Sequence, residues 1–572
     1  SNAMAEEGEL KQRAAAEKQN KKPTPTTAKT EEEVAALAVA RDAKKQQKAR
    51  EKAEKKAKKE AQQKARQNTE VIEEVTYLSH AEQAAYPTMG DFAMIMSRSS
   101  TGRDFCNISE LGKDKTHRPG DTVWLRGRLH SIRITGGICF LVLRQNTSDT
   151  VQATFVKKEA KDQEWACKMV KYMKTLTVES VVDIEGTIAE ATIYSCSVED
   201  VELKINRVHA VAKARAKLPF SVEDAARSDA EVEASKNTEK PFANLGQEVR
   251  LNHRWIDLRT PANNSIMRIQ SAVCQLFRES LYSQGFCEIH TPKLIAGESE
   301  SGAGVFLTDY FGSQACLAQS PQLYKQMAIS SDMNRVFEIA PVFRAENSNT
   351  PRHLCEFTGL DLEMAINDHY AETLEVIHIM FKHIFTGLES RWANELAVIR
   401  EQYASEPLTF TDEPCLLHWP EAIKIWKVAG FDVGDGLQDP NGEMELALGR
   451  AVKEKYGTDF FILDKYPSSI RPFYTMPDPE NPTYSNSYDI FLRGQEICSG
   501  AQRCHDPKLL VKLITQKGIE TGDGLKKYVE SFQHGVSPHA GGGIGLERVE
   551  FLYLGLDNIR MASMFPRTPR RC

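Results

Sequence analysis

The chain of 572 residues is too long for one hydrophobic core, so we expect two or three domains. It is 41% hydrophobic and 27% charged with a formal net charge of −6, and its lack of a long apolar run or signal peptide argues against a membrane or secreted protein. Its twelve scattered cysteines include no CxxC pair, so we expect neither a zinc site nor disulfides, and a cytoplasmic location.

Residues 1–70 form a lysine-rich extension of low complexity, in which Ser1-Asn2-Ala3 resembles an expression remnant. Lys44–Arg66 contains eleven Lys or Arg against three Glu, a net charge of +8. Its residues are good helix formers, but they include no apolar stripe that could pack on a core. The segment is either a solvated, partly disordered tail or a cationic helix that binds phosphates without reading sequence.

Residues 105–215 alternate between apolar and polar side chains, as β-strands do. The strand candidates are Val123–Arg133, Ile138–Gln145, Val151–Val156, Ser180–Ala191 and Val201–Ala214, with a helix over Asp162–Leu176 after the third. This order describes an OB-fold, a barrel that often binds single-stranded nucleic acid. Four arginines lie on the first two strands, namely Arg126, Arg128, Arg133 and Arg144. Phe140 lies among them and could stack on an unpaired base, although a single aromatic is more often part of a core.

Residues 216–248 are polar with two prolines and predict a linker to a large domain over 249–572. Asn263–Gln284 has helical spacing, and Phe286–His290 follows as a strand that leads into Pro292. Further along, Tyr370–Ile399 predicts one amphipathic helix, and short helices and strands are expected to alternate over 400–480.

The segment Phe343–Met364, FRAENSNTPRHLCEFTGLDLEM, concentrates charged residues on two predicted antiparallel strands. Asn347–Pro351 has the composition of the turn between them. Charge density alone leaves two interpretations about equally open: a polar binding site, or a solvated sheet face with internal ion pairs.

The same segment resembles motif 2 of the class II aminoacyl-tRNA synthetases, with the closest likeness to aspartyl-tRNA synthetases of the eukaryotic and archaeal type. The helix, strand and proline over 263–292 resemble motif 1, and GGGIGLERVEFLYLGLDNIR over 541–560 resembles motif 3. The gap between motifs 2 and 3 lacks room for the large bacterial insertion. The resemblance implies an α+β protein: an N-terminal five-stranded OB-fold β-barrel that binds the anticodon, then a class II catalytic domain built on an antiparallel sheet flanked by helices.

The function implied by this resemblance is ATP-dependent activation of L-aspartate to aspartyl-adenylate, followed by transfer to the 3′ end of tRNA-Asp. The implied partners are ATP, aspartate, tRNA-Asp, Mg²⁺ and a second copy of the chain in a homodimer, with other synthetases in a complex as a further expectation. One alternative is a non-discriminating enzyme that also charges tRNA-Asn with aspartate. Another is a non-catalytic, synthetase-like RNA-binding protein, which loss of Arg344, Arg548 or Glu496 would have favoured.

Residue roles also follow from the resemblance. Arg344 and Arg548 are the catalytic candidates, because planar guanidinium groups neutralise phosphates at two points. The ATP-binding candidates are Arg344, Ala345, Glu346, Arg352, His353, Leu354, Phe357, Glu496, Ile544, Gly545, Leu546, Glu547 and Arg548. The aspartate-binding candidates are Glu300, Ser320, Gln322, Lys325, Arg344, Asp361, Ser499 and Arg503. Asp489, Glu496 and Ser499 are the candidates for Mg²⁺, and Phe140 and Gln152 those for the anticodon.

The resemblance assigns Lys325 and Arg503 to the side-chain carboxylate of aspartate, with Asp361 orienting them. A buried carboxylate is costly unless cations pair it, and neutral asparagine would leave those cations under-compensated. Asparaginyl enzymes resemble this chain but carry an acidic residue where Lys325 stands. These residues therefore favour aspartate as the substrate.

Overall fold

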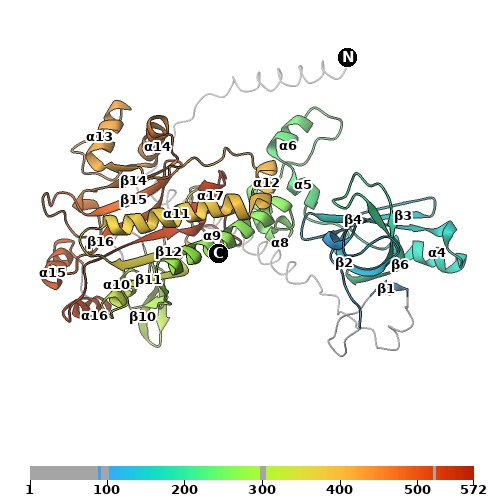
Figure 1. Ribbon diagram of the computed structural model, residues 1–572, viewed down its shortest axis with the longest axis horizontal. Coiled ribbons are helices and arrows are strands. Elements are labelled where there is room, and N and C mark those ends of the chain that lie inside the picture. The colour runs from blue at the N-terminus through green and yellow to red at the C-terminus, as the bar shows by residue number, and fades with distance from the viewer. Residues whose placement is uncertain (1–87, 92–101, 297–303, 520–522) are drawn as a thin grey trace, which may run out of the picture. The chain divides into compact units, whose positions relative to one another are not determined.

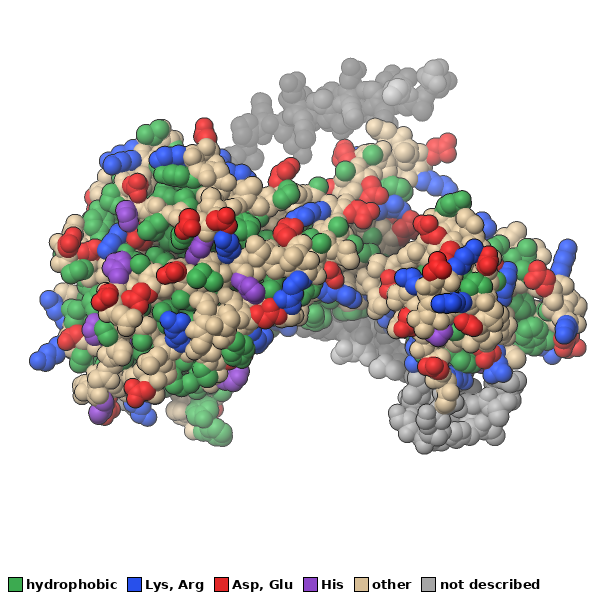
Figure 2. Space-filling model, in the orientation of Figure 1, with side chains coloured by type: hydrophobic (Ala, Val, Ile, Leu, Met, Phe, Trp, Pro, Cys, Tyr) green, Lys and Arg blue, Asp and Glu red, His purple; other side chains and the backbone are tan. Residues whose placement is uncertain are grey.

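The computed structural model describes residues 88–91, 102–296, 304–519 and 523–572. The predictions for the lysine-rich segment Lys44–Arg66 and for Glu300 fall outside these ranges. No helix of the described residues is long and apolar enough to cross a membrane. Acidic and basic side chains are interspersed over the face shown in Figure 2.

The first domain is a closed five-stranded barrel with strand order β2-β3-β4-β6-β5, and β5 also pairs with β2 (Figure 1). Its strands are β2 (Thr122–Thr135), β3 (Ile138–Gln145), β4 (Asp149–Val156), β5 (Val181–Glu190) and β6 (Val201–Ala212), with helix α4 (Gln163–Met173) between β4 and β5. A short strand that the sequence did not predict, β1 (Met89–Asp91), adds to β6 in parallel. Leu125, Leu129 and Leu141 are fully buried in the barrel, because alternate side chains of each strand point inward.

The predicted linker is more structured than its polar composition suggested. It contains the short helices α5 (Val222–Ala226) and α6 (Asp229–Ser235), while α7 (Gln247–Asn252) begins at its last two residues and α8 (Arg254–Asp257) follows. Ser221 and Ser228 accept hydrogen bonds from the first turns of α5 and α6, so part of the polar character consists of helix caps.

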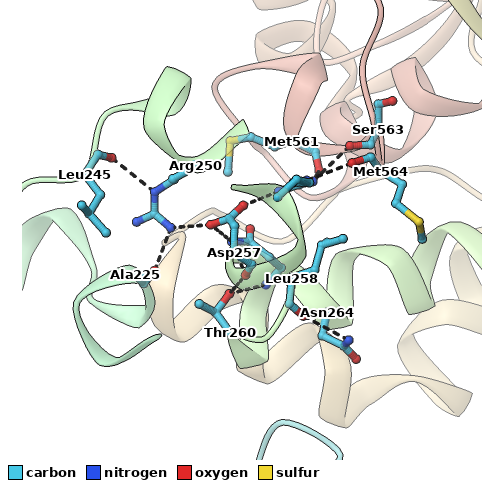
Figure 3. Close-up of polar contacts among 12 residues, drawn as sticks. Ala225, Leu245, Arg250, Asp257, Leu258, Thr260, Asn264, Met561, Ser563 and Met564 are labelled. Carbon is cyan, nitrogen blue, oxygen red and sulfur yellow. Dashed lines mark hydrogen bonds and ion pairs between the residues drawn. The ribbon is translucent and has the colours of Figure 1, made fainter. Parts of the chain in front are cut away.

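Two arginines join these short helices to one another and to the C-terminal segment by hydrogen bonds (Figure 3). Arg250 donates hydrogen bonds to the carbonyls of Leu245 and Ala225 and to the carboxylate of Asp257. Arg254 is buried and donates to the same carboxylate and to three carbonyls of the C-terminal segment, those of Met561, Ser563 and Met564. Both guanidinium groups therefore make structural contacts within the protein.

The large second domain is built on an eight-stranded sheet of order β13-β14-β15-β16-β17-β12-β11-β7, in which only the β13–β14 and β11–β7 pairs are parallel. The strands are β7 (Cys287–Glu288), β11 (Arg335–Phe343), β12 (Glu356–Ala365), β13 (Leu416–His418), β14 (Phe460–Asp464), β15 (Ser487–Leu492), β16 (Gln495–Gln502) and β17 (His539–Gly545). A separate three-stranded sheet contains β8 (Leu294–Ile295), β10 (Ser313–Leu317) and β9 (Leu307–Tyr310).

Helices α9 (Pro261–Ser283), α11 (Ala371–Arg391), α12 (Ala393–Gln402) and α17 (Leu546–Tyr553) contribute side chains to one large core together with the sheet (Figure 1). The expected single helix Tyr370–Ile399 is wrong in one respect, because Trp392 breaks it into α11 and α12. The remaining helices are α10 (Gln322–Ile329), α13 (Trp419–Val428), α14 (Gly442–Tyr456), α15 (Pro507–Gln516) and α16 (Asp523–Phe532). Four single 3₁₀ turns are η1 (Ile108–Glu110), η2 (Lys157–Glu159), η3 (Ser468–Ile470) and η4 (Ile559–Met561).

Candidate active site

The sheet face opposite the large core carries the polar side chains of β12. Leu360, Leu362 and Met364 pack into the core, so the alternate residues Asp361 and Glu363 must point to the other face. Strand β12 lies between β11 and β17, which brings motif 2 against motif 3 at the centre of the sheet.

A cavity of about 350 Å³ lies on this face and collects candidates from motifs 2 and 3 and from β16. The predicted residues that line it are Ser320, Gln322, Arg344, Glu346, Arg352, His353, Leu354, Phe357, Asp361, Glu496, Ser499, Arg503, Ile544, Gly545, Glu547 and Arg548. Ala345, Lys325, Asp489 and Leu546 do not line it. Lys325 and Asp489 are buried close by, and both make ion pairs with residues of the lining.

A β-bulge determines that Glu496 and Ser499 share the face of the cavity. Residues three apart on a regular strand point to opposite faces. Here Ile490 pairs with Cys498 and Phe491 pairs with Glu496, so Ile497 is an extra residue without a partner on β15. The bulge shifts the alternation by one position and brings both side chains to the cavity.

Two cations and two carboxylates form a buried cluster beneath the cavity. Lys325 Nζ lies 3.0 Å from Asp361 Oδ1 and 3.4 Å from Glu363 Oε2. Arg503 donates to both oxygens of Glu363, at 3.0 and 3.3 Å. All four residues are at most 5% exposed. Burial by itself would raise the pKa of Glu363, but Arg503 and Lys325 outweigh it and hold that pKa below its usual value.

Glu363 is a residue of this site that was not predicted, although its alternation with Asp361 on a predicted strand was a usable signal. The structure also changes the charge balance expected at Lys325 and Arg503, because Asp361 and Glu363 already match the two cations. The cluster therefore carries no excess positive charge.

The glycine run of β17 makes room for these two acids. A Cβ atom on Gly541 would lie 2.3 Å from Glu363 Oε2 and 2.2 Å from the carbonyl oxygen of Leu362. A Cβ on Gly543 would lie 3.1 Å from Asp361 Oδ1. The glycines of motif 3 are therefore required by the close approach of motif 2.

An unpredicted arginine, Arg471, binds two of the three metal candidates. It donates to Asp489 Oδ2 at 2.7 Å and to Ser499 Oγ at 3.1 Å, and its guanidinium group lies 3.7 Å from the ring centre of Tyr466. Asp489 Oδ1 is buried without a hydrogen-bond partner among the described residues. Burial, followed by the neighbouring Asp489, raises the pKa of Glu496. Carboxylate oxygens are the ligands that Mg²⁺ prefers, so Asp489 and Glu496 are the residues that could hold this ion.

Other residues of motifs 2 and 3 line the rest of the cavity. The Arg344 guanidinium lies 5.5 Å from the ring centre of Phe357, and Arg548 donates to the backbone carbonyl of Glu496 at 3.1 Å. Burial, then Arg548, lowers the pKa of His353. Glu547 lines the cavity, but its carboxylate accepts the backbone N–H of Thr358, and burial raises its pKa to about 7.

On the barrel, Phe140 and Gln152 lie on the same outer face of adjacent strands. Phe140 pairs with Thr154 and Val142 with Gln152, so the two candidates are diagonal neighbours. Arg133 lies 5.0 Å from the ring centre of Phe140, and Gln152 donates to Glu202.

Two of the four barrel arginines serve internal ion pairs. Arg126 pairs with Asp183, and Arg144 pairs with Glu179. The expectation that the arginines of the first two strands surround Phe140 therefore holds only for Arg133, which the register places directly opposite it.

The model of the family tRNA synthetases class II (D, K and N) matches residues 246–569, and an OB-fold nucleic acid binding domain matches residues 123–211. The cytoplasmic aspartate–tRNA ligase of Bos taurus is 47% identical over 86% of this chain and 95% of the relative. The aspartyl-tRNA synthetase structure from Entamoeba histolytica is 42% identical with a TM-score of 0.76, covering 87% of this chain and 97% of that one. The asparaginyl-tRNA synthetase of Pyrococcus horikoshii complexed with asparaginyl-adenylate is 28% identical with a TM-score of 0.67, covering 79% and 96%.

The chain belongs to the class II tRNA synthetases and, within that class, to the family of the aspartate–tRNA ligases. The resemblance identified in motif 2 and the predicted combination of an OB-fold barrel with a class II catalytic domain are thus confirmed.

Proposed function

We propose that the chain activates L-aspartate with ATP and transfers the aspartyl group to the 3′ end of tRNA-Asp. The observation that carries this proposal is the buried cluster of Lys325, Arg503, Asp361 and Glu363 beneath the cavity formed by motifs 2 and 3. The family membership supports the same activity, and the name of the bovine relative places that enzyme in the cytoplasm. We propose a cytoplasmic location for this chain as well.

In the first step, an oxygen of the substrate α-carboxylate attacks the α-phosphorus of ATP, the bond to the bridging oxygen breaks, and pyrophosphate leaves. No covalent bond to the protein is required, so the side chains must align the reactants and neutralise charge. Arg344 is assigned to the α-phosphate and the α-carboxylate, and Arg548 to the outer phosphate. Phe357 stacks on adenine in this proposal, and Glu346 accepts a hydrogen bond from its amino group.

In this proposal the side-chain carboxylate of aspartate is bound by Arg503, which lines the cavity, and Lys325, buried close by, adds a second positive charge. Both cations are held by the acids of β12, which fixes their N–H groups before the substrate arrives. Gln322, which lines the cavity, has a buried Nε2 without a partner among the described residues, and this group would donate to the substrate. Asparagine would present its own amide donors to cations, which is unfavourable in a buried site.

Mg²⁺ fits beside Asp489 and Glu496, whose oxygens are the ligands that this ion prefers, and when bound it would neutralise phosphate charge. Arg471 donates a hydrogen bond to Oδ2 of Asp489, while Oδ1 has no hydrogen-bond partner among the described residues. Ser499 is the weakest of the three candidates for Mg²⁺, because its Oγ already accepts a hydrogen bond from Arg471.

The barrel is proposed to bind the anticodon through Phe140 and Gln152, and the enzyme is proposed to work as a homodimer. Whether tRNA-Asn is also charged depends on the barrel, where no observation favours that broader activity. Association with other synthetases remains a prediction from the family resemblance.

The decisive experiment is ATP–pyrophosphate exchange with each amino acid in turn, followed by aminoacylation of purified tRNA-Asp and tRNA-Asn. We expect exchange with aspartate alone and charging of tRNA-Asp. Exchange that depends on asparagine or lysine, or no exchange with any amino acid, would overturn the proposal.

A further inference from the structure

The motif 2 residue Arg352 is held by an acid from a distant part of the sequence. Its Nη1 donates to Glu445 Oε2 at 2.9 Å, and the Glu445 side chain is only 15% exposed. Glu445 lies in the first turn of α14, whose first residue, Gly442, also touches the guanidinium group. A Cβ on Gly442 would lie 2.9 Å from Nη1 and 3.0 Å from Nη2. The guanidinium therefore rests against the start of this helix at a place where any larger residue would displace it.

Helix α14 packs against the β15–β16 hairpin, which carries Asp489 and Glu496. A Cβ on Gly449 would lie 2.4 Å from the Cα of Gly494, which is in the turn between β15 and β16. The indole N–H of Trp426 donates to the carbonyl of Met444 and ties α14 to α13. Glu445 thus projects from a helix whose position relative to Glu496 is set by direct backbone contact.

The ion pair lies at the edge of the cavity. Arg352 lines that cavity together with Arg548 and Glu496, and Arg548 donates to the backbone carbonyl of Arg352 at 3.5 Å. Burial raises the pKa of Glu445 to about 7, opposed by Arg352 and reinforced by Glu496. Its carboxylate is therefore close enough to the ATP candidates to interact with them electrostatically.

We propose that Glu445 is a positioning residue for ATP, which acts by holding Arg352 in the orientation that receives the triphosphate. A guanidinium group has five N–H donors, so the hydrogen bond to Glu445 leaves others for phosphate oxygens. Fixing a flexible side chain before the ligand arrives reduces the entropy lost on binding. The inference rests on the proposed role of Arg352 at ATP.

The test is steady-state pyrophosphate exchange by Glu445→Gln in the full-length protein. We expect KM for ATP to rise about 5- to 10-fold, since a charge-assisted hydrogen bond becomes a weaker neutral one, while kcat and KM for aspartate stay within about twofold. A merely structural role would instead lower kcat by disturbing the hairpin that carries Glu496. The matched control is Glu443→Gln, the same change at an exposed position of the same helix turn, which should leave all three constants unchanged.

A double-mutant cycle separates this inference from the function on which it rests. If Glu445 acts through Arg352, then Glu445→Gln should have no further effect in an Arg352→Ala background. Gly442→Ala should raise KM for ATP by displacing the guanidinium group while leaving Glu445 in place. Unchanged KM in Glu445→Gln, with raised KM in Arg352→Ala, would overturn the inference alone. Unchanged KM in Arg352→Ala would overturn the role of Arg352 at ATP and the inference with it.

Discussion

Arg503 and Glu363 form a two-point ion pair that is almost completely excluded from water. The guanidinium Nε and Nη2 each donate to a different carboxylate oxygen, and neither residue is more than 3% exposed. The pair joins β12 of motif 2 to the end of β16, and Lys325 adds a second cation to the same carboxylate. The carboxylate of Glu363 therefore fixes both cations in place.

Glu363→Gln should destabilise the catalytic domain by about 3–5 kcal/mol, because it leaves buried cations uncompensated. The measurement is thermal or denaturant unfolding, with tryptophan fluorescence as the probe. Glu375→Gln, at an exposed position of α11, is the matched control and should unfold like the parent protein. Equal unfolding midpoints for the two variants would contradict this account of the cluster.

Lys325→Met should lower aspartate-dependent pyrophosphate exchange at least about 10²-fold, because it removes a buried positive charge next to the cavity and unpairs Asp361. Lys382→Met removes a cation from an exposed ion pair with Asp412 and should leave exchange unchanged. Unchanged exchange in Lys325→Met would refute the assignment of this residue to aspartate.

Glu547→Gln should be more stable than the parent protein at pH 8 and similar to it below pH 4.5. Burial raises the pKa of Glu547 from an ordinary value of 4.5 to about 7. The folded protein therefore retains a proton that the unfolded chain releases, and the stability from this group is lost as the pH rises from 4.5 through 7. Melting temperatures of the two proteins across this range provide the measurement, and a difference that does not change with pH would argue against it.

The homodimer prediction is tested by light scattering at micromolar concentration, which should give twice the monomer mass. The apolar face of α9 does not support this prediction, because Ile266, Ile269 and Phe277 are buried in the core of the chain itself. The prediction depends on the form of motif 1 and on exposed apolar residues at the end of α9 and in β8, such as Tyr282 and Leu294. A stable, fully active monomer would refute it.

Deleting residues 4–70 should weaken tRNA binding about equally for cognate and non-cognate tRNA and should flatten its dependence on salt. Lys44–Arg66 has a charge of +8, and each phosphate that it neutralises releases counterions. Binding by the full-length and truncated proteins at several salt concentrations provides the comparison, with pyrophosphate exchange as the control. An unchanged salt slope would show that the extension does not bind RNA.

Local patterns were sufficient for much of the fold. Period-two alternation predicted the strands of the barrel, because burying one face of a strand requires an apolar residue at every second position. Helical spacing predicted α9, and the alternation after Pro351 predicted β12. The other strand expected within Phe343–Met364 was misplaced, because the partner of β12 is β11, which ends at Phe343. The break in the predicted helix at Trp392 and the short helices of the linker were missed, because packing and capping contacts decide them.

The chemistry of the cavity divides in the same way. The sequence itself determined which arginines, acids and glycines belong to the site, because each motif is a run of neighbouring residues that can be identified without the fold. Only the tertiary structure decided that a bulge at Ile497 places Glu496 and Ser499 on the same face of the sheet, and that Arg471 binds Asp489. It also decided that Glu445 reaches Arg352, 93 residues earlier in the chain. Such contacts depend on strand register and helix packing, which bring together residues whose separation along the chain contains no information about their distance in space.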